Sequence, residues 1–145
     1  MNNNMKLEFI AISENEKFAR TAVAAFVTQL NPTLDEIEDI KAAVSEAVTN
    51  AIIHGYKDSV GTVVVSCTLM ENTVEIVISD KGCGIENVEL ARTPLYTGAE
   101  DSERSGLGFT VMETFMDNVA VESDLGKGTT VILTKSFTTP SPSSL

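Results

Sequence analysis

Hydrophobic and polar positions alternate at the start of the chain, where Leu7 and Phe9 are interleaved with Lys6 and Glu8. An alternation of period two is typical of a strand that buries one face and exposes the other. The pattern therefore predicts a first strand over Met5–Ile12.

The spacing then changes to three or four residues over two longer segments, from residue 14 to about residue 30 and from residue 33 to about residue 55. Apolar residues at this spacing form a stripe along one side of a helix. We therefore expect two amphipathic helices. Their buried stripes are predicted to contain Phe18, Ala22, Val23, Ala25, Phe26, Val27 and Gln29 in the first helix, and Ile37, Ile40, Val44, Ala47, Val48, Ala51 and Ile52 in the second.

Signals for helix ends accompany both stripes. Ser13 is followed three residues later by Glu16, and Thr33 by Glu36, which is the pattern of a capping box. A proline at position 32 breaks the chain between the two helices. Gly55 is expected to end the second helix as a left-handed cap.

The second half of the chain is mostly β-like. Thr62–Met70 and Thr73–Ser79 are rich in β-branched residues and are separated by a two-residue turn, which predicts a hairpin. Helical spacing returns over Gly106–Met116. Val119–Glu122 and Thr129–Phe137 are predicted to form a second hairpin.

Two segments do not fit these elements. Residues 92–105 contain few core candidates and are interpreted as a mobile functional loop, whereas the Ser/Pro-rich residues 138–145 are expected to form a disordered tail. Residues 1–137 are then one domain. The element order predicts the α+β class: a two-layer α/β sandwich with a mixed, mostly antiparallel sheet and helices on one face.

Composition narrows the possible functions. The 145 residues are 43% hydrophobic, enough for one core, and the formal net charge is −11. The negative electrostatic field of such a chain disfavours direct binding of nucleic acid or of an anionic membrane, and it favours a partner with a basic patch. The sequence shows neither a signal peptide nor a membrane-spanning run, and its two cysteines have no metal-like spacing, so a reducing cytoplasm is the expected compartment.

The first candidate for chemistry is the pair Glu46 and Asn50 on the second helix. Residues four apart project from the same side of a helix. An amide oxygen can coordinate Mg²⁺, and a carboxylate can orient a hydroxyl or accept its proton. An ordinary solvated helix face is the competing interpretation of this pair alone.

The second candidate is Asp80-x-Gly82-x-Gly84, directly after a predicted strand. A carboxylate at a strand end can accept a hydrogen bond from the exocyclic amine of adenine, and glycines allow the backbone to approach a planar ligand. A tight turn without a ligand would use the same residue types.

The third candidate is the start of the helix at Gly106-Leu107-Gly108. Backbone N–H groups at a helix start attract phosphate, but the dipole contributes only about 0.3–1 kcal/mol at exposed sites. Mg²⁺ and Arg104 are expected to supply the remaining positive charge in so acidic a chain. A glycine hinge is the alternative. Residues 126–130 are expected to form a turn, and whether a threonine hydroxyl of this turn also contacts the ligand stays open. The chain has no P-loop pattern.

The ordered succession of these motifs resembles the GHKL superfamily of ATPases and kinases. Within it, the segments VSEAVTNAIIHGY, ERSGLGFTVMETFMDNVAVES and GKGTTV closely resemble the anti-sigma F factors of spore-forming bacteria, which are serine kinases. The likeness extends from about Met5 to Lys135.

The resemblance implies a role for each matching residue. Asn50 would bind Mg²⁺, and Glu46 would be the catalytic base. In a kinase, Arg104, the side-chain donor next to the glycines, would stabilise charge during phosphoryl transfer. ATP or ADP would be held at the purine end by Asp80, Gly82, Gly84 and Thr130, and at the phosphate end by Gly106, Leu107 and Gly108 under a lid at 92–105. Arg20 would contact a partner.

The resemblance also implies a homodimer that inhibits a sporulation sigma factor and phosphorylates a serine of an anti-anti-sigma factor. Three alternatives remain at this point. The chain could be an ATP-gated module that only sequesters a sigma factor, a stress-response relative, or a simple ATPase. The retention of Glu46 favours a kinase over a pure binding module.

Overall fold

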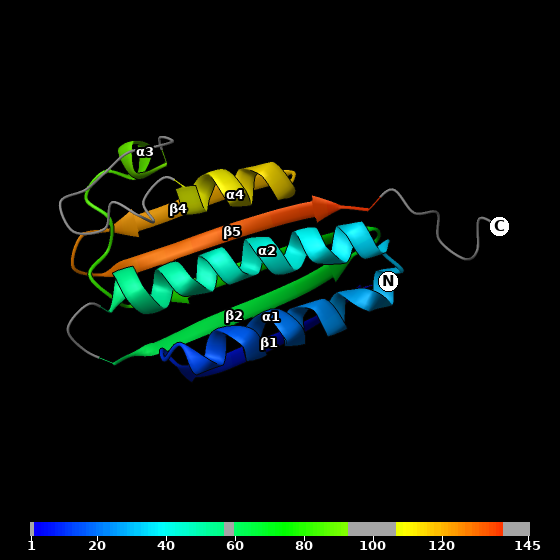
Figure 1. The fold of residues 1–145 in the computed structure, drawn as a ribbon, viewed down its shortest axis with the longest axis horizontal. Coiled ribbons are helices and arrows are strands. Elements are labelled where there is room, and N and C mark those ends of the chain that lie inside the picture. Colours follow the sequence, from blue (N-terminus) through cyan, green and yellow to red (C-terminus); the bar gives the residue numbers. More distant parts are fainter. Residues whose placement is uncertain (1, 57–59, 93–106, 138–145) are drawn as a thin grey trace.

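A computed structural model describes residues 2–56, 60–92 and 107–137 (Figure 1). The predicted tail at 138–145 and most of the predicted loop at 92–105 lie outside these residues. Five strands form one sheet in the order β1-β2-β3-β5-β4. The strands are β1 (Asn2–Ile10), β2 (Thr62–Met70), β3 (Thr73–Asp80), β4 (Asn118–Asp124) and β5 (Gly128–Ser136).

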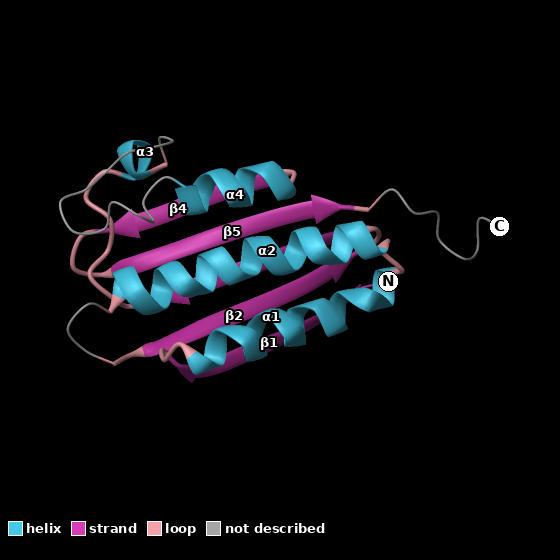
Figure 2. Ribbon diagram, in the orientation of Figure 1, coloured by secondary structure: helices cyan, strands magenta, loops and turns pink. Residues whose placement is uncertain are grey.

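Helices cover one face of this sheet, as Figure 2 shows for α1, α2 and α4. Their bounds are α1 (Glu14–Val27), α2 (Leu34–Asn50), α3 (Val88–Ala91) and α4 (Leu107–Phe115). The predicted two-layer α+β sandwich is therefore confirmed. The expectation of a mixed sheet is wrong for the described strands, because all four strand pairs are antiparallel.

The first helix begins where predicted, but α1 ends at Val27 and a 3-10 turn continues to Leu30; its buried side matches the predicted stripe only in part, at Val23 and Val27. Phe18 is 55% exposed, whereas Ala19, Val23, Ala24 and Val27 face the core. The prediction placed the stripe about one residue out of phase because large apolar residues occur on both sides of this helix. The capping box at Ser13 is also wrong, since its backbone is helical and its side chain makes no cap hydrogen bond.

The second helix follows its prediction closely. Thr33 Oγ1 accepts a hydrogen bond from the Glu36 N–H at 3.1 Å, and the Thr33 N–H donates to Glu36 Oε1 at 2.8 Å, so this capping box is present. The expected end is different, because Asn50 is followed by a π-helical turn over Ala51–Gly55. Gly55 is not a left-handed cap, since positive φ among the described glycines occurs at 84, 126 and 128.

The core lies between the helices and the covered face of the sheet. Alternate residues of β2 and β3 are buried, as the predicted hairpin requires, and they pack against buried side chains of α2 and α4. Lys135 is buried as well, and its ammonium donates to the Phe115 carbonyl at 2.7 Å. This contact places a positive charge at the C-terminal end of α4, where it stabilises the helix dipole. Within the described residues no helix has the length and apolar character needed to span a membrane.

Candidate functional site

Glu46, Asn50 and Gly108 come together where the last part of α2 meets the start of α4. A methyl group built on the Gly108 Cα would lie 3.2 Å from Glu46 Oε2, 3.2 Å from Asn50 Nδ2 and 3.5 Å from Asn50 Oδ1. Both polar side chains are only partly buried and belong to the flank of the apolar stripe. The helical spacing of Glu46 and Asn50 therefore presents a carboxylate and an amide directly to the first turn of α4.

Asp80 forms a second polar centre at the end of β3. Its Oδ1 accepts a hydrogen bond from the Gly82 N–H at 2.9 Å. On the other side lies Gly55, where an added methyl group would be 3.0 Å from both Cγ and Oδ1 of Asp80. Gly55 ends the π-helical turn that begins directly after Asn50, so one continuous segment connects the two polar centres.

The Asp80 carboxyl has a perturbed protonation equilibrium. Burial raises its pKa above the usual range, and hydrogen bonds from the backbone N–H groups of Gly82 and Thr129 partly oppose this effect. A carboxylate that is partly removed from water gains when a ligand donates a hydrogen bond to it. Asp80 is therefore suited to receive the amine of a purine.

The glycines after Asp80 have a structural reason that the sequence did not reveal. A side chain at Gly82 would overlap the Gly55 carbonyl, and that carbonyl also accepts the Cys83 N–H at 2.8 Å. Gly84 has φ of +77° and lies against the Asp124 backbone. These two glycines allow three backbone segments to pack together beside Asp80. Whether they also make room for adenine stays a prediction.

The sheet register distinguishes the two threonines after the β4–β5 turn. Asp80 pairs with Thr129, and Ser79 pairs with Thr130. Because side chains alternate along a strand, Thr129 lies on the same face as Asp80, whereas Thr130 lies on the face not covered by helices. Thr130 Oγ1 is 3.3 Å from Ser79 Oγ there. Thr129 is therefore the better placed candidate for the purine end, and counting back from buried Val131 could have identified it.

Ser123 connects this part of the sheet to the glycine loop and was also missed. Its Oγ accepts the Ile85 N–H at 2.7 Å and is 2.8 Å from Thr129 Oγ1. Tyr56 has a similar role, since its hydroxyl accepts the Lys81 N–H at 2.7 Å and donates to a β2 carbonyl at 2.8 Å. No spacing rule in the sequence marks either residue.

Other predicted site residues lie apart from these centres or outside the described chain. Arg104 and Gly106 are not among the described residues, and Leu107 is the first residue of α4. Arg20 lies on α1, where its Nε is 3.3 Å from Glu16 Oε2 and its side chain is 35% exposed. It is thus accessible to a partner, although an ion pair already restrains it.

The donor set around Asn50 suits Mg²⁺ that arrives with a nucleotide. No cluster of three or more histidine, cysteine, aspartate or glutamate side chains that could hold a metal occurs within residues 2–56, 60–92 and 107–137. Mg²⁺ in nucleotide sites does not need such a cluster, because phosphate oxygens and waters fill most of its coordination positions. One amide oxygen beside one carboxylate fits this mode of binding.

Comparison with known proteins agrees with this geometry. Residues 11–135 match the family model of the histidine kinase-like ATPase domain. The chain is 56% identical over 137 residues to the anti-sigma F factor of Clostridium acetobutylicum, an alignment that covers 94% of this chain and 96% of that protein. The anti-sigma F factor of Clostridium beijerinckii is 59% identical over 136 residues, with 93% and 95% covered. This chain belongs to the anti-sigma F factor family.

Family membership confirms the resemblance seen in the sequence motifs. It also confirms the function class expected from that resemblance, which is an anti-sigma factor with an ATP-dependent kinase domain. Solved structures agree at the level of the fold. The RsbU and RsbW domains of Rv1364c from Mycobacterium tuberculosis match with a TM-score of 0.70 at 21% identity, covering 96% of this chain and 34% of that one. The catalytic domain of the histidine kinase ThkA matches with a TM-score of 0.56 at 17% identity, covering 92% and 96%.

Proposed function

We propose that this protein is a protein serine kinase that uses Mg²⁺–ATP and also binds and inhibits a sigma factor. The approach of Glu46 and Asn50 to Gly108 is the observation that carries the proposal. It puts a possible base and a possible metal ligand beside the N–H groups of a helix start. These are the three kinds of group that phosphoryl transfer requires.

Each residue has a distinct role in this proposal. The Asn50 amide oxygen would hold Mg²⁺, which when bound neutralises phosphate charge. The Gly108 end of α4 would face the phosphates, helped by the helix dipole. Asp80 would accept a hydrogen bond from the adenine amine, with Thr129 beside it. Arg104, which the sequence suggests as a further phosphate contact, would add positive charge.

Glu46 would take the proton from the substrate serine as its oxygen attacks the γ-phosphorus of ATP. The bond between that phosphorus and the β–γ bridging oxygen breaks, and ADP leaves with the electron pair. Glu46 is suited to this role because its Oε2 lies beside Gly108 and is not committed to the core. In a simple ATPase the same carboxylate would activate water instead.

The partners follow from the family and from charge. We propose a sigma factor as the inhibited partner, an anti-anti-sigma factor as the serine substrate, and a homodimer as the working unit. A net charge of −11 favours partners with basic surfaces. Arg20, partly exposed on α1, would contact a partner. A sporulation role in the cytoplasm is the simplest setting, and a stress-response system is the alternative.

Transfer of labelled γ-phosphate to an anti-anti-sigma factor from a spore-forming bacterium tests the kinase. Glu46→Gln should lower the rate by about 10²–10⁴, because general-base catalysis contributes about that much, while nucleotide binding survives. Glu38→Gln is a matched control, since Glu38 lies exposed on the same helix and pairs only loosely with Lys41 at 3.7 Å.

The outcomes separate the candidate functions. Transfer to serine that depends on Glu46 supports the kinase. Sigma-factor binding that changes with nucleotide, without any transfer, would favour the ATP-gated binding module. An unchanged transfer rate in Glu46→Gln would remove Glu46 from the role of base.

A further inference from the structure

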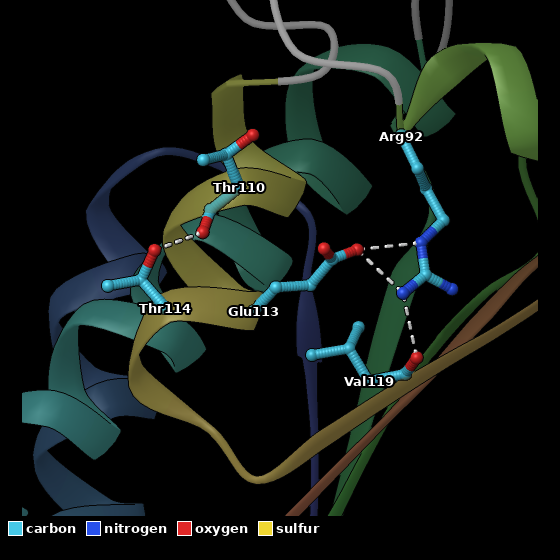
Figure 3. A network of polar contacts seen from close by, with 5 residues as sticks. All are labelled: Arg92, Thr110, Glu113, Thr114 and Val119. Atoms are coloured by element: carbon cyan, nitrogen blue, oxygen red, sulfur yellow. Dashed lines mark hydrogen bonds and ion pairs between the residues drawn. The ribbon is translucent and has the colours of Figure 1, made fainter.

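Arg92 connects three elements, and one of them is α4, the helix that carries Gly108. Its Nε and Nη2 donate to Glu113 Oε1 at 3.0 and 2.7 Å, and Nη2 also donates to the Val119 carbonyl at 2.9 Å (Figure 3). Arg92 directly follows α3, Glu113 belongs to α4, and Val119 belongs to β4. The Arg92 side chain is 28% exposed, so this ion pair is partly shielded from solvent.

The ion pair of Arg92 with Glu113 joins residues 80–92, here called the arm, to α4, the helix that carries Gly108. Along this arm the Cys83 N–H donates to the Gly55 carbonyl and the Ile85 N–H to Ser123 Oγ. These two bonds fix the beginning of the arm to the π-helical turn and to β4. Arg92 fixes its far end to α4.

Apolar packing alone leaves α4 able to rotate slightly over the core, and Arg92 can restrict this rotation. The helix has nine residues and is held on the core by buried Phe109 and Met112, followed by Met116. Apolar packing is non-directional, so it resists separation from the core more strongly than a small rotation over it. Glu113 lies on the exposed side of α4, and its contact with Arg92 is directional, because two guanidinium N–H groups converge on Glu113 Oε1.

We propose that Arg92 is a positioning residue that sets the orientation of α4, and through it the distance of the Gly108 backbone from Glu46 and Asn50. This inference rests on the proposed function of that site. Arg92 does not touch the site residues itself. It acts through a short helix whose first turn would face the phosphates, where small displacements have large effects on catalysis.

The test measures ADP affinity with Mg²⁺ and with a chelator, in the wild type, Arg92→Ala, Arg92→Lys and Glu113→Gln. Arg92→Ala should reduce the Mg²⁺-dependent gain in affinity about threefold to tenfold, which falls within the roughly 2- to 30-fold range in which residues remote from a ligand modulate its binding. Lysine keeps the charge but cannot form the same fork, so it should rescue only in part. Glu113→Gln should weaken binding in the same direction, and combining it with Arg92→Ala should add little.

Amide hydrogen exchange of the ligand-free protein gives an independent readout. Exchange should become faster at the hydrogen-bonded amides of residues 111–115 of α4 in Arg92→Ala, because the helix is freed to move, whereas the N–H groups of its first turn have no intrahelical acceptor to lose. Lys41→Ala is the control, since it removes an exposed ion pair with Glu38 on α2 and should leave both measurements unchanged.

If the wild type does not bind Mg²⁺–ADP, the proposed function fails. If the wild type binds Mg²⁺–ADP and the variants bind it equally well, the positioning role is wrong, whether or not their melting temperatures are lower. A lower melting temperature alone would mean that Arg92 only stabilises the fold. Should Arg92→Ala not fold, Glu113→Gln decides by the same criterion.

Discussion

Gly108→Ala separates stability from activity at the centre of the candidate site. The new Cβ would lie 3.2 Å from Glu46 Oε2 and from Asn50 Nδ2, a few tenths of an ångström closer than ordinary contacts. Both neighbours are the ends of flexible side chains, so they can move aside. Gly108 is the second residue of α4 and does not have positive φ, so alanine fits its backbone.

The two effects of this substitution have opposite signs. Alanine favours a helix over glycine by up to about 1 kcal/mol, so the free energy of unfolding should stay level or rise by about 0.5–1 kcal/mol. Phosphoryl transfer should fall about tenfold or more, because a misplacement of 1 Å can cost about 10²-fold and the shift here is smaller. Urea unfolding measures the first effect, and transfer of labelled phosphate measures the second.

Thr114→Ala is the matched control for the helix. Thr114 is exposed on α4, where its hydroxyl donates to the Thr110 carbonyl at 2.7 Å (Figure 3). Alanine there raises helix propensity without approaching Glu46 or Asn50, so activity should stay at the wild-type level. Full transfer activity in Gly108→Ala would mean that the approach of Gly108 to the two side chains has no catalytic role.

Three further perturbations have definite expected results. Asp80→Asn should weaken adenine-nucleotide affinity about 10- to 100-fold through the lost charged acceptor. Because burial raises the pKa of Asp80, the nucleotide-free variant should also unfold at a higher temperature than the wild type at neutral pH, and this gain should shrink as the pH falls through that pKa and the wild type becomes protonated. A variant less stable than the wild type at neutral pH would contradict this. Gly82→Ala should cost about 1–3 kcal/mol of folding stability, as seen by urea unfolding, because its side chain would overlap the Gly55 backbone, and an unchanged midpoint would contradict the described packing. A thiol reagent at mildly alkaline pH should modify exposed Cys83 in the native protein but reach Cys67 only after unfolding, since Cys67 is buried and burial raises its pKa to about 12. Equal rates of modification at the two cysteines would contradict this.

Much of the fold follows from local rules that the structure obeys. The Thr33 cap, the hairpin of β2 and β3, and the buried stripe of α2 depend on neighbours within a few residues. The side of α1 that faces the core does not, because Phe18 could be buried as well as Ala19 by helical spacing alone. Only the packing of α1 on α2 and the sheet decides between them.

The same distinction applies to the candidate site. The spacing of Glu46 and Asn50 already places them on one side of a helix, but their meeting with Gly108 depends on how α4 packs on α2. Gly55 is not the expected helix cap because its small size makes room for the Asp80 carboxyl at the end of β3, and no local pattern reports a contact of that range. The strand register that favours Thr129 over its neighbour is likewise a property of pairing.

In the proposed function, one Mg²⁺–nucleotide spans from Asn50 to Asp80. Calorimetric titration with ADP, in Mg²⁺ and in chelator, tests it most directly on the wild type, Asn50→Ala and Asp80→Asn. Asn50→Ala should bind ADP equally with or without Mg²⁺, and Asp80→Asn should keep the Mg²⁺ effect at weaker affinity. If the wild type showed no Mg²⁺-dependent ADP binding, or if both variants bound as the wild type does, Asn50 and Asp80 would not hold the two ends of one nucleotide.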